Sequence, residues 1–366
     1  MSVRDVVIVG AGPSGLSAAI ACKQRGLDYQ VIEQGVLVNS IYRFPPQMIF
    51  FTTPELLEIG GLPFVSPYDK PTRGEALNYY RKVVGAYDLQ ICYEEQVLSI
   101  EREAGEPASQ RGSNGDGPVF AVETRSSKGV RRARHARHVI LATGYYDHPV
   151  MLGVPGEDLP HVRHYYAEAH AHYRQRVVVV GGGNSAAEAS LEMYRAGAHV
   201  TLVHRAPTLK PSIKYWVRPD IENRIKEGSI AAQFSAVVRE IRPTSVVIAP
   251  CHAPRAAMVA DVPVPADGSA GYVAPARSGP SSEVEIPADA VYLLTGYRAD
   301  TDLMVRAGIT LTERRGPVHD PATFETNVPG LFVAGGAIAG IDTGTIFIEN
   351  GRFHGEKIVE VIAGRG

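Results

Sequence analysis

Near its N-terminus the chain contains the stretch VVIVGAGPSG, at residues 6–15. The apolar residues predict a buried β-strand, and the small residues after it predict a turn into a helix. The glycines have the spacing G-x-G-x-x-G: Gly10 permits the tight turn, Gly12 lets the backbone approach a pyrophosphate, and Gly15 lets helix and strand pack. A strand at residues 29–33 completes a βαβ unit. The stretch therefore predicts a dinucleotide site, with the phosphates at the helix N-terminus.

The second strand of this unit ends in a carboxylate, Glu33. It follows the glycine motif by about 20 residues, where an acidic side chain can accept hydrogen bonds from the adenine ribose hydroxyls. The same charge would repel a 2′-phosphate. We therefore expect the site to take an ADP group without that phosphate, as in FAD or NAD.

The same pattern recurs in the middle of the chain. A strand at residues 176–180 leads into Gly181-x-Gly183-x-x-Ala186, and the next strand, at residues 200–203, is followed by His204 and Arg205. A guanidinium at this place can bind a ribose 2′-phosphate bidentately, which favours NADPH over NADH. Lys210 and Lys214 could assist, but we interpret them as ordinary surface charges.

Three further strands end in glycine, at residues 139–144, 291–296 and 330–336. Together with the Pro- and Gly-rich residues 151–156, they predict an α/β fold of two Rossmann-like dinucleotide-binding domains. An NADPH-binding domain, residues 153–287, is inserted in a split FAD-binding domain, residues 1–152 and 288–366. Residues 104–117 and 252–283 are predicted surface insertions, and the last helix is expected from about Thr345 to Ile362.

Composition narrows the classes of function. The 366 residues are 45% hydrophobic and 21% charged, with a formal net charge of −2, which disfavours nucleic-acid and anionic-lipid partners. No apolar run reaches the ~20 residues of a membrane helix, and no signal peptide is apparent, so we expect a cytoplasmic enzyme.

Cysteine and histidine give little sign of metal or dithiol chemistry. Cys22, Cys92 and Cys251 are the only cysteines and form no Cys-x-x-Cys motif, so neither a zinc cluster nor a redox-active dithiol is predicted. Cys22 is expected to be a buried apolar residue of a helix. Four histidines lie close together in the sequence, at His161, His164, His170 and His172. No cysteines accompany them, so we interpret them as packing residues rather than as a metal site.

Two dinucleotide sites predict a hydride relay, in which NADPH reduces a flavin and the flavin reduces an acceptor. Such a site needs hydrogen-bond donors near the flavin N1/O2 edge. The helix start expected at Thr345 and Ile346 is a candidate donor, and an ordinary helix start is the alternative. His354 is a candidate proton donor for the product, and a helix residue buried against a neighbour is the alternative.

At this point the sequence resembles a known family. The paired glycine motifs, Ala142-Thr143-Gly144, Thr295-Gly296-Tyr297 and residues 330–335 resemble thioredoxin-reductase-like flavoproteins. Within that group the chain resembles the bacillithiol disulfide reductases, and the similarity spans nearly its whole length. It is carried by residues 38–42, 50–52, 164–166, 183–186, 214–216 and 347–355.

The resemblance implies which residues bind the cofactors. For FAD it implies Gly10, Gly12, Pro13, Ser14, Gly15, Glu33, Gln34, Asn39, Thr143, Gly144, Gly335, Thr345 and Ile346, with Val97 against the adenine. For NADPH it implies Gly183, Asn184, Ser185, Ala186, His204 and Arg205.

The resemblance also implies an activity, the reduction of a low-molecular-weight thiol disulfide such as bacillithiol disulfide, and a homo-oligomer. Two residues depart from the pattern. Ser14 stands where a cysteine has been proposed in the family, and a serine cannot form a mixed disulfide; Gly336 stands where relatives of thioredoxin reductase carry an aspartate. Either the thiol is unnecessary, or the acceptor differs.

Other functions on the same scaffold stay open at the level of sequence. A ferredoxin or flavodoxin reductase, whose partner is a redox protein, is the main alternative. A flavin monooxygenase ranks below it, because no complete fingerprint of that class is apparent. A non-enzymatic sensor of the NADPH/NADP ratio ranks last, since it has no need of a flavin.

Overall fold

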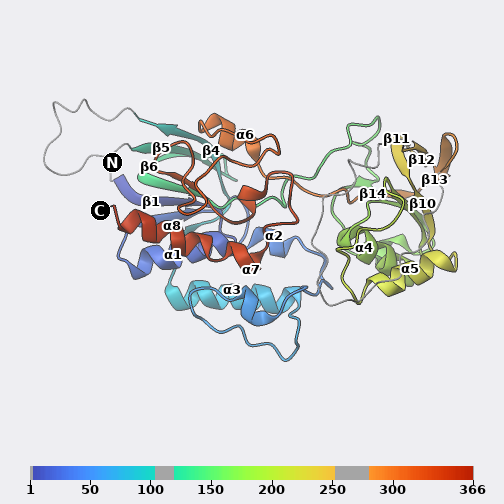
Figure 1. Cartoon of the computed structure of the whole chain (residues 1–366), viewed down its shortest axis with the longest axis horizontal. Helices are drawn as coiled ribbons and strands as arrows, with labels where there is room; N and C mark the ends of the chain where they lie inside the picture. The colour runs from blue at the N-terminus through green and yellow to red at the C-terminus, as the bar shows by residue number, and fades with distance from the viewer. Residues whose placement is uncertain (1–2, 104–118, 252–279, 366) are drawn as a thin grey trace, which may run out of the picture. The chain divides into compact units, whose positions relative to one another are not determined.

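The computed structural model describes residues 3–103, 119–251 and 280–365 (Figure 1). The chain divides into two compact units: residues 1–148 with 297–366, here called the larger unit, and residues 149–296, the smaller unit. The sequence-based boundaries lie close by, at 152/153 and 287/288. Of the predicted insertions, residues 104–117 and 252–279 lie outside the described residues.

The larger unit is built on a mixed sheet with the strand order β3-β2-β1-β6-β5-β4, and β15 also pairs with β6. β1, β2, β3, β6 and β15 pair in parallel, whereas β4, β5 and β6 pair antiparallel. The strand bounds are β1 Val3–Val9, β2 Tyr29–Ile32, β3 Ile91–Cys92, β4 Glu95–Arg102, β5 Phe120–Ser126, β6 Arg131–Leu141 and β15 Leu331–Val333.

Helices cover both faces of this sheet (Figure 1). One apolar core joins the sheet to α1 (Pro13–Gln24), α3 (Arg73–Tyr87) and α8 (His354–Ala363). A second core, on the other face, joins it to α6 (Thr301–Arg306). Shorter elements complete the unit: α2 Asn39–Tyr42, η1 Pro54–Leu57, η5 Gly335–Ala339 and α7 Ile348–Gly351. Because β1, β2, β6 and β15 are parallel, their carboxyl ends and the loops that follow lie along one edge of the sheet.

The C-terminal helix differs from the prediction. Instead of one helix from Thr345 to Ile362, the structure has α7 and α8, and residues 345–347 precede α7. The Asn350 side chain accepts from the Phe347 N–H at 2.8 Å and donates to the Thr345 carbonyl at 2.9 Å. A side chain that satisfies the backbone in this way competes with helix formation, and this explains the later start.

The smaller unit holds a five-stranded parallel sheet in the order β10-β9-β8-β14-β7. Its strands are β7 Val162–Arg163, β8 Arg176–Val180, β9 His199–His204, β10 Ala231–Phe234 and β14 Ala290–Leu293. α4 (Asn184–Arg195), α5 (Arg218–Lys226) and η3 (His170–His172) accompany it. A separate antiparallel sheet contains β11 Ala236–Arg242, β12 Ser245–Pro250 and β13 Val284–Pro287. The whole chain therefore has an α/β fold.

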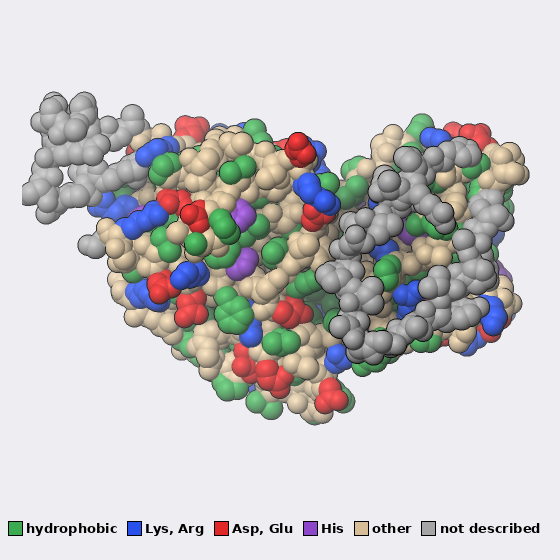
Figure 2. Space-filling view, in the orientation of Figure 1, with side chains coloured by type: hydrophobic (Ala, Val, Ile, Leu, Met, Phe, Trp, Pro, Cys, Tyr) green, Lys and Arg blue, Asp and Glu red, His purple; other side chains and the backbone are tan. Residues whose placement is uncertain are grey.

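Charged side chains of both signs are interspersed on the face of the larger unit that Figure 2 shows. This distribution is in keeping with the formal net charge of −2. Among the described residues, no helix is long and apolar enough to cross a membrane.

Candidate functional site

The glycine turn after β1 requires glycine for reasons of space. Gly10 has a φ of 105°, and a methyl group there would overlap the carbonyl of Ala142. A methyl group at Gly15 would overlap the Gly10 carbonyl, whereas at Gly12 it would meet no atom within 4 Å. Gly12 caps α1, Pro13 begins the helix, and no side chain caps its first turn. The backbone amides at this helix N-terminus are thus presented for an anion.

Glu33 fastens the loop after β2 to this turn. Its buried carboxylate accepts from the Ala11 N–H and the Gly35 N–H, both at 2.8 Å. Burial raises the pKa of Glu33, the two amide hydrogen bonds oppose the rise, and nearby Asp147 adds to it. Each carboxylate oxygen retains a lone pair, so hydroxyl donors of a ligand can still be accepted.

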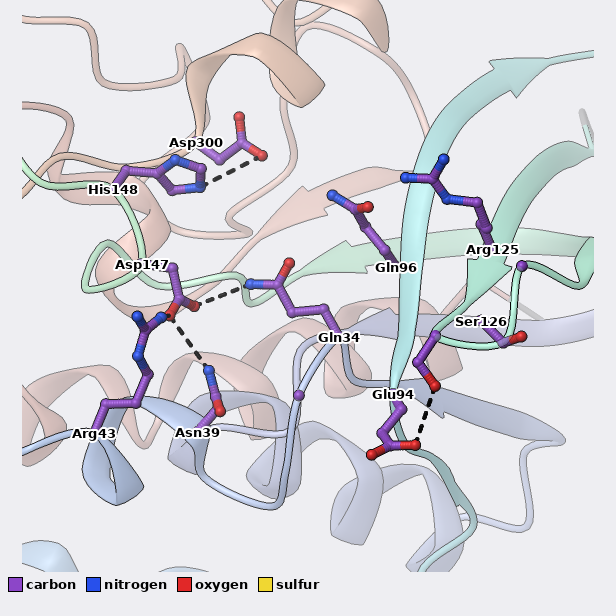
Figure 3. Close-up of a pocket in the computed structure, with 13 residues that line it drawn as sticks. Gln34, Asn39, Arg43, Glu94, Gln96, Arg125, Ser126, Asp147, His148 and Asp300 are labelled. Carbon is purple, nitrogen blue, oxygen red and sulfur yellow. Dashed lines mark hydrogen bonds and ion pairs between the residues drawn. The ribbon is translucent and has the colours of Figure 1, made fainter. Parts of the chain in front are cut away.

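A cavity of about 740 Å³ adjoins this loop (Figure 3). All of its lining residues belong to the larger unit: Gln34, Gly35, Asn39, Arg43, Glu94, Gln96, Arg125, Ser126, Ser127, Gly129, Asp147, His148 and Asp300. Of the residues predicted for FAD, Gln34 and Asn39 are therefore brought together here, next to Glu33. The volume of the cavity lies in the usual range for ligand pockets.

Sequence reasoning missed the charged residues of this cavity, above all Asp147. Its carboxylate accepts hydrogen bonds from Gln34, Asn39 and Arg43, which converge on it in Figure 3. One signal could have found it: Asp147 follows the strand that ends at Leu141, and polar residues after parallel strands gather at the ligand edge of such a sheet.

The loop between β2 and α2 contains a strained residue. Val38 is buried and has a left-handed backbone, with φ of 47° and ψ of 50°. For a β-branched residue this conformation costs roughly 1–3 kcal/mol and persists only where its surroundings enforce it. Its N–H donates to the Ala11 carbonyl at 3.1 Å, which ties it to the glycine turn.

Thr143 and Gly144 follow β6 at the same sheet edge. The Thr143 hydroxyl is buried and has no hydrogen-bond partner among the described residues. Gly144 has a φ of 67°, and a methyl group there would meet no atom within 4 Å. A buried hydroxyl without a partner calls for an explanation, and a polar ligand is one. The side chain of Val97, predicted to meet the adenine, is buried in the apolar core of the sheet. Its neighbour Gln96 lines the cavity instead.

Ser14 lies against Gly335 and Gly351. Its hydroxyl donates to the Gly351 carbonyl at 2.9 Å, and a methyl group at Gly335 would overlap the hydroxyl oxygen. Gly335 in turn donates its N–H to Nδ1 of His354 at 3.1 Å. Ser14 thus has a structural role, because its hydrogen bond joins the first turn of α1 to the C-terminal segment.

His354 is held as a neutral imidazole. Its Nδ1 accepts a hydrogen bond, so the ring proton is on Nε2, and the ring stacks on Phe324 with centroids 4.3 Å apart. Burial, with a contribution from His319, lowers the pKa of His354 to about 4. Near neutral pH it therefore carries no imidazolium proton.

Thr345 and Ile346 do not lie at a helix start. Thr345 is exposed, and its hydroxyl donates to the Asp342 carbonyl at 2.9 Å. Ile346 lies near Gly351, where a methyl group would stand 3.5 Å from its Cγ2. The Thr345 N–H also donates to the Asp342 carbonyl, at 3.2 Å, so the expected donation from a helix start does not apply to this residue.

The smaller unit has a similar turn after β8. Gly181 has a φ of 152°, and a methyl group there would stand 2.5 Å from the Leu294 carbonyl oxygen. Gly183 caps α4 without a side-chain cap, Ser185 is exposed and Ala186 is buried. Asn184 holds the loop that follows β9: it accepts from the Lys214 N–H at 2.8 Å and donates to the Ser212 carbonyl at 3.0 Å.

Positive charge gathers beside this turn. His204 is buried with Nε2 unpartnered among the described residues, and burial, then Lys210 and Arg205, lower its pKa to about 4. Partial desolvation and then Arg205 lower the pKa of Lys210. The described residues provide no carboxylate partner for Arg205 or Lys210. Lys214 is not the surface charge predicted: it is buried and pairs with Glu188 at 2.5 Å.

The remaining candidates have structural surroundings. Cys22 is buried, and burial raises its pKa to about 12; Cys92 and Cys251 are half-buried. His172 bonds to Gln175 and Tyr292. Within residues 3–103, 119–251 and 280–365, no three His, Cys, Asp or Glu side chains are placed to hold a metal.

The fold and its two glycine turns place the chain among the α/β oxidoreductases. It belongs to the pyridine nucleotide-disulphide oxidoreductase family, whose model matches residues 7–275. It is 38% identical to bacilliredoxin reductase Bdr of Bacillus subtilis (strain 168), over 100% of this chain and 99% of that protein.

Solved structures agree with this assignment. The bacillithiol disulfide reductase Bdr of Bacillus cereus has a TM-score of 0.85 and 35% identity, and the alignment covers 100% of both chains. The thioredoxin reductase of T. acidophilum, at 22% identity, has a TM-score of 0.68 over 99% of this chain and 98% of that one, and so shares the fold.

Proposed function

We propose that the chain is an NADPH-dependent FAD flavoprotein that reduces a low-molecular-weight disulfide such as bacillithiol disulfide. The observation that carries this proposal is the full-length similarity to the solved bacillithiol disulfide reductases Bdr, whose names state that substrate. The described residues fit both cofactors, as follows.

The larger unit suits the FAD. The uncapped N-terminus of α1, with open space at Gly12, would bind the diphosphate, and Glu33 would accept from the adenine ribose hydroxyls. The cavity beside Glu33 supplies room for part of the nucleotide, and Thr143 offers a hydroxyl with no partner in the described part of the chain. Glu33 would also exclude a 2′-phosphate by charge.

The smaller unit suits the NADPH. Arg205 and Lys210 lie near the uncapped N-terminus of α4, because the Lys210 N–H donates to the Gly182 carbonyl at 2.9 Å. Two cations without a carboxylate partner in the described chain are matched by a doubly charged 2′-phosphate. His204 lies so close to Gly182 that a methyl group there would overlap the ring, so it shapes the turn as a neutral side chain.

When bound, the two cofactors supply the redox chemistry: NADPH, a proton and a disulfide yield NADP⁺ and two thiols through the flavin. Position 14 supplies no thiol because it is a serine, and the Ser14 hydroxyl donates to the Gly351 carbonyl. Cys22 is buried, with a raised pKa, and cannot act as a thiolate near neutral pH. The substrate would therefore be reduced without a mixed disulfide at either residue.

Anaerobic stopped-flow spectroscopy tests the proposal. The purified protein is reduced with NADPH and mixed with bacillithiol disulfide, ferredoxin or oxygen, and flavin absorbance is followed. Fast reoxidation by the disulfide is expected. Slow reoxidation by the disulfide with fast transfer to ferredoxin would make the chain a ferredoxin reductase, and a peroxyflavin spectrum with oxygen would make it a monooxygenase. Protein that contains no flavin would overturn all three.

A further inference from the structure

Two segments of the larger unit that are far apart in sequence meet at one carboxylate. Residues 34–43 follow β2, and residues 144–148 follow β6. Asp147 Oδ2 accepts from Gln34 Nε2 at 3.0 Å, and Oδ1 accepts from Asn39 Nδ2 at 3.3 Å and from an Arg43 guanidinium nitrogen at 2.7 Å (Figure 3). The Asp147 side chain is only 14% exposed. All four residues line the cavity, so this cluster forms a continuous part of its wall.

The segment that Asp147 fastens does not hold its own shape. It contains Val38 in its left-handed conformation, and α2 begins at the very next residue. Gly35 leaves room for Asn39, since a methyl group at Gly35 would stand 2.5 Å from Asn39 Oδ1. A short helix after a strained residue needs outside contacts to stay in place. Asn39, the first residue of α2, and Arg43, directly after its last residue, both donate to Asp147.

The same two segments also meet through aromatic rings. Phe44 and Tyr146 pack edge to face with centroids 4.8 Å apart. Phe44, the residue after the first segment, and Tyr146 do not line the cavity, whereas the residues of the Asp147 cluster do. Loss of the carboxylate should therefore disturb the cavity wall while the aromatic contact keeps the segments attached.

We propose that Asp147 is a positioning residue for the flavin nucleotide: its carboxylate holds Gln34, Asn39 and Arg43 in the arrangement that receives the adenosine part of FAD. The proposal rests on the proposed function, because it presumes that the cavity takes this nucleotide. Asp147 acts through the three side chains that it holds, and it is not itself assigned to the ligand.

The test is the affinity of the flavin-free, full-length protein for FAD, measured by titration of flavin fluorescence. In Asp147→Asn the amide has the size of the carboxylate, but one side of it presents an NH₂ group to donors. Hydrogen bonds to charged groups are strong enough that we expect the Kd for FAD to rise about 10-fold or more. Asp147→Glu keeps the charge and should recover part of the affinity.

Asp28→Asn is the matched control. Asp28 also pairs with an arginine, Arg4, but it lies beside the amino ends of β1 and β2, at the opposite edge of the sheet from the cavity. Its Kd for FAD should equal that of the wild type. The melting temperature of the flavin-free protein provides the second reading, and Asp147→Asn should change it no more than Asp28→Asn does. A purely structural role would move this melting temperature.

Each possible result either supports or overturns the positioning role of Asp147. An unchanged Kd in Asp147→Asn, or an Asp147→Glu variant as weak as Asp147→Asn, overturns the inference and leaves the proposed function intact. Wild-type protein that binds no FAD overturns both. If Asp147→Asn proves unstable, Gln34→Ala, Arg43→Gln and their double variant replace it, because both side chains donate to Asp147: a double variant no weaker than the weaker single variant supports the inference, and additive losses refute it.

Discussion

Glu33 and Arg205 each stand directly after the strand that follows a glycine turn, yet their charges are opposite. Their places after these strands were predictable from the sequence, and their roles toward the riboses of two dinucleotides stay predictions. The place of Asp147 at the ligand edge could be predicted because it follows β6, but its three partners could not. Its importance depends on three side chains of a loop more than 100 residues earlier, and nothing local to the sequence specifies that loop's path.

Replacement of Arg205 tests the basis of cofactor choice. Arg205→Ala should raise the KM for NADPH roughly 10-fold or more, by the usual strength of charged hydrogen bonds, and change the KM for NADH little. Steady-state rates with both nucleotides measure this. Arg195→Ala, whose arginine pairs with Asp220, serves as control. Equal losses for both nucleotides would remove Arg205 from the 2′-phosphate role.

His354 predicts a pH dependence of stability. Burial lowers its pKa from the usual 6.5 of histidine to about 4 in the folded protein, so the unfolded chain binds the proton more readily. The contribution is therefore complete above about pH 6.5 and is lost as the pH falls toward 4. By linkage, the wild type should lose roughly 1–2 kcal/mol more than His354→Gln between pH 7.5 and pH 5. Urea unfolding at the two pH values would show it, and equal losses would contradict it.

At the scale of elements, the strands that end in glycine were predictable, because an apolar run followed by small residues is typical of a buried strand and a tight turn. The C-terminal helix was not. Its hydrophobic pattern continues through residues 345–347, but the Asn350 side chain bonds to the Phe347 N–H and the Thr345 carbonyl there. The Ser14 hydroxyl also donates to the Gly351 carbonyl. Both effects depend on contacts that a period of apolar residues does not encode.

The crossing of α8 on α1 depends on Gly355. A methyl group there would stand 2.5 Å from the Ser14 carbonyl oxygen and overlap the Ala18 nitrogen. Gly355→Ala should therefore destabilise the protein by roughly 2–3 kcal/mol through overpacking. Gly85, in α3, has open space, and Gly85→Ala should stabilise it by about 0.5 kcal/mol through helix propensity. Chemical denaturation of both variants gives the comparison, and a neutral Gly355→Ala would refute the close crossing.

At the scale of the whole molecule, each unit has apolar cores of its own. Repetition of one strand–turn–helix pattern in the sequence pointed to two domains, and the Pro- and Gly-rich residues pointed to the boundary. The first boundary in the structure, 148/149, lies four residues before the predicted one. The second, 296/297, lies nine residues after the predicted 287/288, because β14 pairs with β8 and β7 and so belongs to the smaller unit rather than to the FAD-binding part.

Residues 149–296 should therefore fold alone. We expect this fragment to unfold cooperatively and to bind NADPH but not FAD. Circular dichroism and calorimetric titration measure the two properties, and the fragment with Arg205→Ala is the control for the binding. A fragment without a cooperative transition would show that the smaller unit depends on the rest of the chain.

The contact between Ser14 and Gly351 joins the two ends of the chain. During synthesis on the ribosome, α1 is complete long before α8 has been translated, so the apolar face that α8 will cover stays exposed meanwhile. The smaller unit, by contrast, is contiguous and can fold as soon as it emerges. The larger unit can therefore be completed only after α8 has left the ribosome, and chains that stall before residue 351 should be the ones that chaperones retain and proteases remove.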